Sequence, residues 1–447
     1  MNKPYMMPVS GALPDLKIPE PRISKLMIFL IKVLGRVYLF LFYGVARVLL
    51  RGEKVLFDAF KRSLEGKSRC IIAFRHPNGG EPQFLTWFFL CKLKALAARS
   101  GVRFPRRPHA VFVYSYEVAR WGGWVARFVM PRVGAMPIHH SKVDSQGMTR
   151  IYKAIVDGPF PLALAPEGQV SYTTDSVPRL EQGVIRIGFA AADRMSKAEK
   201  PAPVEILPIS VYYRFGSWGK FTLELLLRKI EKATGFRRRG KAVLPFAERL
   251  RVCRDHILAV NEKRYCIKMD PALSFEERID AVIVAALDSA EKILGVRSSG
   301  NHFARIYGLR QICWDRIVLP GVDSLSNLSG IEREVTDLLA GEAWYAGRHL
   351  EIVDFSWYFR VPLPADDASL HHKIEYAQNL WDFANRTMGG AYANRISIFP
   401  RRVIIHAAPP INLTERLPAY NNDKKSAINS AMADLKQAYM DCIEEIT

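Results

Sequence analysis

The segment Cys70-Ile-Ile-Ala-Phe74 runs directly into Arg75-His76-Pro77-Asn78-Gly79-Gly80-Glu81-Pro82, and a helical pattern follows over residues 83–93. The unbroken apolar run indicates a short buried strand. Asparagine and paired glycines then mark a tight exposed loop, and Pro82 fits the first turn of a helix behind Glu81. A buried strand, a tight loop and a helix in immediate succession predict an α/β fold.

Similar strand-like runs recur on either side of helical patterns. They cover residues 109–114, 162–165 and 206–213, and helices are expected at 56–64, 82–97 and 183–192. This alternation favours a layered α/β architecture, so we expect a mixed sheet flanked by helices.

The chain is mostly helical from about residue 225. Ser274 and Glu277 form a capping-box pattern ahead of an amphipathic helix that ends at Gly295. Further helical patterns cover 331–349 and 371–388, after which a strand returns at 402–406 and a helix closes the chain at 424–446. The returning strand indicates that the helices are an insertion within one α/β domain.

The charge of the chain is concentrated in its first third. The net charge of the 447 residues is +20, and residues 1–150 hold 25 basic and 8 acidic side chains, which is +17. With 49% hydrophobic and 24% charged residues the chain is globular, not disordered. The six cysteines are scattered without a C-x-x-C pair, so we expect neither disulfides nor a metal site, and a reduced compartment.

Residues 24–51 are apolar enough to suggest contact with a membrane. The longest uncharged run, 37–46, has ten residues, whereas a spanning helix needs about 20. On a helical wheel five cations share one face and apolar residues fill the rest, the pattern of a basic amphipathic helix in a membrane interface. A long helix packed on the protein's own core, and a membrane span, are the alternatives. The five cations are Lys25, Lys32, Arg36, Arg47 and Arg51.

A histidine at the end of a strand and a carboxylate in the same loop suit acid–base chemistry. Glu81 can accept from one ring nitrogen of His76 while the other takes a proton from a hydroxyl. The same spacing recurs at His139–Asp144 and His349–Asp354, but only His76 follows a buried strand. The alternative is a surface histidine beside an exposed glutamate, with no function in catalysis.

A second strand end carries a carboxylate as well. The run 162–165 ends in Pro166-Glu167-Gly168-Gln169. Because ligands bind at the carboxyl ends of strands in α/β sheets, this turn and the His76 loop are expected to meet at one cleft.

Four sequence blocks in this order resemble the glycerolipid acyltransferase family, whose best-known members are lysophosphatidic acid acyltransferases. The blocks are His76–Glu81, residues 134–142, 165–171 and 206–211, and the late segment 403–411 resembles the strand and turn that close these domains. The resemblance covers roughly 55–225 and 400–447. The helices between resemble an insertion found in a longer bacterial subgroup.

The resemblance implies a role for each of these loops. His76 is expected to act as general base with Glu81 as its orienting partner, and backbone N–H groups near Gly79, Gly80 or Gly168 to stabilise an oxyanion. The donor would be acyl-CoA or acyl carrier protein, with no cofactor and no metal. The expected acceptor-site residues are Glu167, Gly168, Gln169, His140, Lys142 and Arg75.

The sequence departs from the family pattern at three places. Glu81 replaces an aspartate, the third block has Gln169 and Val170 where Thr and Arg are usual, and the second has His139, His140 and Lys142 where an Arg is expected. The missing groups are those with which the family holds an acceptor phosphate. The resemblance therefore supports acyl transfer more firmly than any particular acceptor.

These observations predict a membrane-associated acyltransferase of phospholipid biosynthesis. It would move an acyl group from a thioester to a hydroxyl of 1-acylglycerol-3-phosphate or a related lysolipid, at the cytoplasmic face of a membrane as a peripheral or monotopic protein. The alternative is a non-catalytic basic protein that binds membrane or nucleic acid on such a scaffold. A third reading is a divergent relative that binds lipid without catalysis. Nucleic acid is disfavoured because five of the cations share a helix with a broad apolar arc.

We expect the chain to consist of five parts. They are an N-terminal tail (1–23), a membrane-interfacial helical segment (24–65), an acyltransferase α/β core (66–228), a helical insertion (229–399) and the closing strand and helix of the core (400–447).

Overall fold

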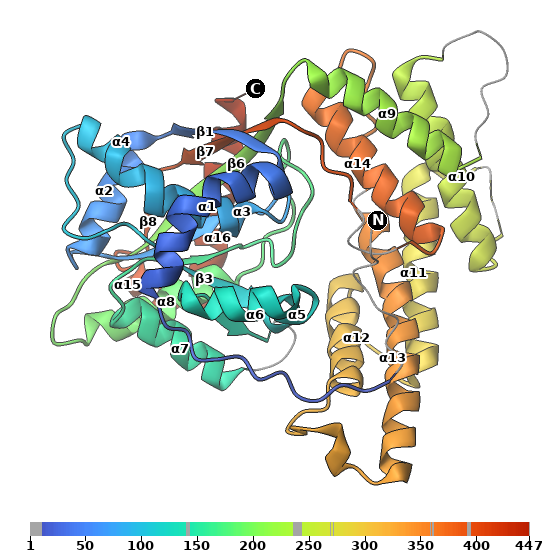
Figure 1. Cartoon of the computed structure of the whole chain (residues 1–447), viewed down its shortest axis with the longest axis horizontal. Helices are drawn as coiled ribbons and strands as arrows, with labels where there is room; N and C mark the ends of the chain where they lie inside the picture. The colour runs from blue at the N-terminus through green and yellow to red at the C-terminus, as the bar shows by residue number, and fades with distance from the viewer. Residues whose placement is uncertain are drawn as a thin grey trace. The chain divides into compact units, whose positions relative to one another are not determined.

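A computed structural model describes residues 11–139, 144–235, 244–268, 270, 272–357, 359, 362–390 and 395–446. The chain divides into two compact units (Figure 1). The sheet unit comprises residues 18–216 and 399–447, and the helical unit comprises residues 1–17 and 217–398. The sheet unit is thus built from two separate stretches of the chain.

A mixed eight-stranded sheet forms the centre of the sheet unit, as predicted. The strand order is β1-β7-β6-β2-β5-β3-β4, and β8 pairs with β6. Strands β6, β2, β5, β3 and β4 run parallel, whereas β7 is antiparallel to β6 and β1 is parallel to β7. The strands are β1 (Val45–Arg51), β2 (Arg69–Phe74), β3 (Val111–Ser115), β4 (Met136–Ile138), β5 (Leu162–Leu164), β6 (Val204–Phe215), β7 (Arg401–Ala407) and β8 (Ile411–Asn412).

Helices cover both faces of this sheet, which explains why its central strands are apolar throughout. Side chains alternate along β2, so Ile72 and Phe74 pack with α2 and α3 while Ile71 and Ala73 pack with α8 and α16. The helices of the unit are α1 (Lys25–Tyr43), α2 (Glu53–Leu64), α3 (Glu81–Phe88), the π-helical turn η1 (Phe89–Leu93), α4 (Lys94–Arg99), α5 (Tyr116–Trp121), α6 (Gly123–Arg132), α7 (Ser145–Val156), α8 (Gly183–Ser196), α15 (Leu417–Asn422) and α16 (Lys424–Glu444).

The expected single helix over residues 24–51 is wrong. Helix α1 ends at Tyr43 because Gly44 adopts a left-handed conformation with φ +65°, which favours glycine. The next residues form strand β1, which pairs with β7; Val45 lies opposite Arg401, and after a one-residue shift Arg47 lies opposite Arg402 (Figure 1). Arg47 and Arg51 therefore lie on a strand, and only three of the five expected cations lie on α1.

The helical unit contains the capping box read from the sequence. Ser274 and Glu277 cap α11 reciprocally, and Gly295 ends that helix with φ +64°. The second of its two stretches begins at Ser217, so α9 belongs to this unit. Its helices are α9 (Trp218–Ala233), α10 (Phe246–Arg264), α11 (Phe275–Leu294), α12 (His302–Ile317), the 3-10 turn η2 (Leu325–Asn327), α13 (Gly330–Trp357) and α14 (Leu370–Thr387).

Candidate active site

The loop after β2 brings His76 and Glu81 into contact. The Nδ1 atom of His76 lies 2.6 Å from Oε2 of Glu81, the first residue of α3. The backbone N–H of Gly79 donates to the same oxygen at 2.8 Å, and φ +89° at Gly79 turns the loop back toward it. The hydroxyl of Tyr213 on β6 donates to the other oxygen, Oε1. The buried carboxylate is therefore held at both oxygens.

His76 reaches the surface on its other side. Its side chain is 18% exposed, whereas that of Glu81 is fully buried. Because Nδ1 faces Glu81, Nε2 is the ring nitrogen that can meet a substrate. The ring of Phe74 packs edge-on against the imidazole, with centroids 5.8 Å apart, and limits its rotation. The pair has the geometry of a general base and its orienting partner.

The two groups shift each other's ionisation. Burial disfavours the charged form of His76, but the hydrogen bond to Glu81 and the charges of Glu81 and Glu167 outweigh it and raise the pKa of His76 above 6.5. Burial also disfavours charged Glu81, but His76 and Tyr213 outweigh it and lower the pKa of Glu81. Because a base must be unprotonated, His76 becomes available as the pH rises through its raised pKa, with Glu81 already ionised.

The acceptor-site prediction requires Arg75 and Glu167 to be accessible to a substrate. In the structure neither side chain reaches the surface. Both side chains are buried, and Nε of Arg75 donates to Oε1 of Glu167 at 3.1 Å. The remaining nitrogens of Arg75 donate to the carbonyls of Thr173, Thr174 and Ser176. Oε2 of Glu167 accepts the backbone N–H of His76 at 2.8 Å. This ion pair holds two loops together, and neither charge can meet a substrate.

Two of the three expected oxyanion donors, Gly79 and Gly168, donate their N–H groups within the protein. The N–H of Gly79 donates to Glu81, and that of Gly168 donates to the carbonyl of Ala165 at 3.2 Å. Gly80 is buried, and a Cβ there would lie 2.6 Å from the ring of Tyr43. In this structure Gly79 and Gly168 thus shape the loops and have no N–H to offer to a bound oxygen.

The second block contributes a helix cap instead of a catalytic pair. The backbone N–H of His139 donates to Asp144, which caps α7, and the His139 ring stacks on Tyr116 at 4.1 Å. His140 and Lys142 lie outside the described residues. In the helical unit His349 is hydrogen-bonded to Tyr265. Of the three matches to the His-x4-Asp/Glu spacing, the one at His76 joins an imidazole to a buried carboxylate.

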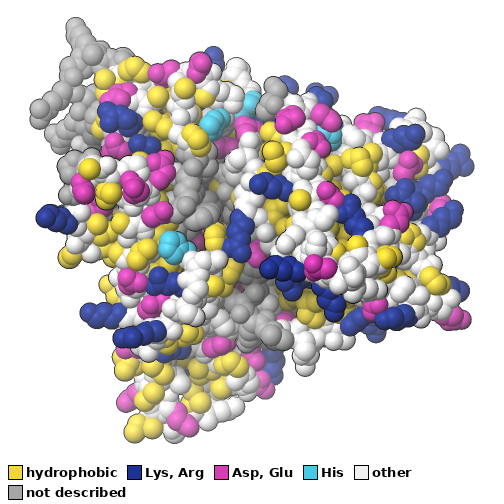
Figure 2. All heavy atoms as spheres, turned by 180° about the vertical axis from the view of Figure 1, so that it is seen from behind, with side chains coloured by type: hydrophobic (Ala, Val, Ile, Leu, Met, Phe, Trp, Pro, Cys, Tyr) yellow, Lys and Arg dark blue, Asp and Glu magenta, His cyan; other side chains and the backbone are white. Residues whose placement is uncertain are grey.

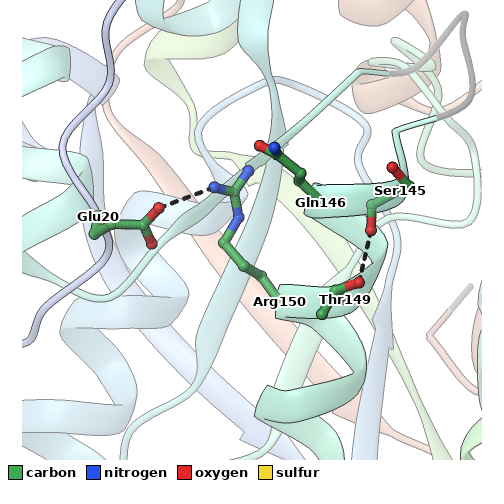
Figure 3. Close-up of a pocket in the computed structure, with 5 residues that line it drawn as sticks. All are labelled: Glu20, Ser145, Gln146, Thr149 and Arg150. Carbon is green, nitrogen blue, oxygen red and sulfur yellow. Dashed lines mark hydrogen bonds and ion pairs between the residues drawn. The ribbon is translucent and has the colours of Figure 1, made fainter.

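A pocket lies beside the start of α7, near the second block (Figure 3). Arg150 reaches across it to Glu20 at 3.2 Å. None of its lining residues belongs to the His76 loop. Gln169, the remaining predicted acceptor residue, is half-buried and does not line this pocket. The lining residues are Glu20, Ser145, Gln146, Thr149 and Arg150.

Two residues at this site were not identified from the sequence. Tyr213 holds Glu81, and Arg401 at the start of β7 donates to Asn78 Oδ1 at 2.8 Å and to the carbonyl of Tyr43 at 2.5 Å. The Arg401 guanidinium lies 4.4 Å from the centre of the Tyr213 ring. The sequence offers no local signal for either residue, because β6 also carries Tyr212 and β7 begins with two arginines.

Within the described part of the chain, no group of three or more His, Cys, Asp or Glu side chains is arranged to hold a metal ion. A scan against family models, a search of curated proteins and a search of solved structures each found no match to this chain.

Proposed function

We propose that the protein is a membrane-associated O-acyltransferase that moves an acyl group from a thioester to a hydroxyl of a glycerolipid. The observation that carries this proposal is the pair of His76 and Glu81, with Nδ1 of the imidazole 2.6 Å from a buried carboxylate and the ring edge open to solvent at the end of a parallel strand. Such a pair contributes about 10²–10⁴-fold to a proton transfer.

In the proposed acyl transfer, Nε2 of His76 is the atom that accepts a proton, because Nδ1 faces Glu81. The acceptor hydroxyl gives its proton to Nε2 of His76 as its oxygen attacks the thioester carbonyl carbon. The tetrahedral intermediate then collapses, the carbon–sulfur bond breaks, and the imidazolium returns the proton to the leaving thiolate. Glu81 stabilises the transient imidazolium, so no covalent intermediate on the protein is required.

The outward face of α1 supports association with a membrane. Only Met27, Ile28 and Leu39 of this helix are buried. Among the helices of the described residues, α1 is the one that is long and apolar enough to cross a membrane. Its large apolar side chains face away from the protein, the reverse of an ordinary surface helix, and favour lipid over nucleic acid as the partner. They include Leu26, Phe29, Val33, Leu34, Val37, Leu41 and Phe42, each more than half exposed.

A cluster of cations borders this face. Arg36 of α1 and Lys92 of η1 both lie within 6 Å of the centre of the Trp87 ring. Burial raises the pKa of Cys91, and the nearby charges of Lys32, Lys92 and Arg107 oppose that shift. Figure 2 shows further Lys and Arg side chains on the opposite side of the sheet unit, along its outer edge. Cations beside an apolar face suit the anionic headgroups of a cytoplasmic leaflet.

The helix also ends at the catalytic loop. Tyr43, its last residue, packs against Gly80, and its carbonyl accepts from Arg401. A lipid acceptor that arrives along α1 would therefore meet the His76 loop directly. Acyl-CoA or acyl carrier protein would supply the thioester.

The test replaces His76 by glutamine and follows acyl transfer from a radiolabelled thioester to lysolipids. We expect a loss of about 10²-fold or more, because the base is removed. His349→Gln is the matched control, since it removes a histidine of the same spacing from the helical unit. A near-native rate for His76→Gln would contradict the proposal.

A lipid-binding protein without catalysis is the second candidate. The engaged N–H groups of Gly79 and Gly168 favour it, because they leave no oxyanion donor at these two positions. It predicts vesicle binding by the wild type without turnover of any thioester.

A further inference from the structure

We propose that Tyr213 and Arg401 are positioning residues that hold Glu81 and the His76 loop in the arrangement needed for proton transfer. This inference rests on the proposed function, and it adds two residues that the motif around His76 does not contain. Tyr213 belongs to β6 and Arg401 to β7, and these antiparallel strands pair beside β2 in the sheet.

Tyr213 fixes the carboxylate from the side opposite His76. Oε2 of Glu81 receives the imidazole and the N–H of Gly79, while Oε1 receives the hydroxyl of Tyr213. Without that hydroxyl, a buried carboxylate oxygen would lose the donor that Tyr213 provides, which is costly inside a protein. Burial and the charge of Glu81 raise the pKa of Tyr213 well above its usual value, so the hydroxyl keeps its proton.

Arg401 fixes the loop itself. It is 3% exposed, and its guanidinium is bonded to Asn78 within the loop and to the carbonyl of Tyr43 at the end of α1. The same group lies over the ring of Tyr213, where a cation is attracted by the π electrons. One side chain therefore links the catalytic loop, the α1 terminus and the tyrosine that holds Glu81.

The two residues occupy the strand ends at which the sheet unit is interrupted. Strand β6 ends at Phe215 and β7 begins at Arg401, and residues 217–398 form the helical unit between them. The site is therefore complete only when the chain after the helical unit has paired with β6.

The test compares Tyr213→Phe with Tyr212→Phe. Both remove one buried hydroxyl from β6, but Tyr212 packs on the opposite face of the sheet, with Ile404 and Cys442. The protonation of His76 is followed by deuterium exchange at its C2 position as a function of pH, with mass spectrometry. The kcat and KM of thioester turnover are measured alongside.

We expect Tyr213→Phe to lower the pKa of His76, because the carboxylate that raises it is no longer fixed on Nδ1. We also expect kcat to fall about tenfold at unchanged KM, with Tyr212→Phe like the wild type. Arg401→Lys keeps the positive charge but loses the planar guanidinium that bonds to two partners at once. We expect it, too, to lower the pKa of His76 and kcat. It provides the test if Tyr213→Phe does not fold.

The exchange measurement is independent of turnover. If no thioester is turned over but the pKa of His76 still falls in the two variants, the proposed function fails and the positioning role stands. An unchanged or raised pKa of His76 in both Tyr213→Phe and Arg401→Lys would overturn the inference.

Discussion

The carboxylate of Glu81 accepts from an imidazole and a backbone N–H of its own loop, and from the phenol of Tyr213 on a distant strand. The pairing of His76 with Glu81 could be predicted, because both lie in one loop after a strand. The third donor could not, because Tyr213 is 132 residues away and nothing local distinguishes it from its neighbour Tyr212.

Tyr213 was missed in the sequence, whereas Arg75 and Glu167 were noticed but assigned to contact with a substrate because of their charges. Both strand ends do meet, as predicted from the sheet, but the two charges neutralise each other inside. The sequence around a charged residue beside His76 is the same whether that residue faces solvent or the interior. Only the packing of the two loops distinguishes these cases.

The ion pair predicts a large effect on stability. Glu167→Gln leaves the guanidinium of Arg75 buried without its counter-charge, and we expect the free energy of unfolding to fall by about 3–5 kcal/mol. Urea titration followed by fluorescence measures this. Glu20→Gln removes the partner of Arg150 at the surface, where Glu20 is 79% exposed, and should cost less than about 1 kcal/mol. Equal small effects would contradict the buried role of Glu167.

At the scale of elements, the apolar strands and the long capped helices were predictable. The runs that became β2, β6 and β7, and the capping box of α11, carry local signals. The end of α1 was not predicted, because apolar residues continue on both sides of Gly44. The change from helix to strand there depends on pairing with β7, more than 350 residues later in the chain, for which no local pattern exists.

The outward face of α1 predicts how the protein binds vesicles. Val33→Glu together with Val37→Glu places two carboxylates on a face that is already exposed, so the fold should persist. We expect co-sedimentation with phosphatidylglycerol vesicles to fall at least tenfold, because charged groups enter the apolar region of a bilayer poorly.

Val335→Glu is the matched control for this experiment, since Val335 is similarly exposed on α13 of the helical unit. Unchanged binding by the α1 variant, or an equal loss in the control, would count against α1 as the membrane-binding element.

At the scale of the whole molecule, the returning strand at 402–406 correctly indicated that the helices interrupt one sheet. The long stretch of the helical unit begins at Ser217, before the expected boundary at 229, because α9 follows β6 after a turn of only two residues. The excess of positive charge also falls mainly in the sheet unit, since residues 18–150 belong to it. The His76 loop, the apolar helix α1 and most of the excess cations therefore belong to one unit.

The central claim is that this unit transfers an acyl group from a thioester to a lipid hydroxyl. The most direct measurement offers purified protein palmitoyl and oleoyl thioesters with a panel of lysolipids and analyses the lipids by mass spectrometry. The account predicts one acylated product that accumulates in step with released thiol and is absent with His76→Gln. No acylated lipid from any acceptor, with protein that still binds vesicles, would contradict it.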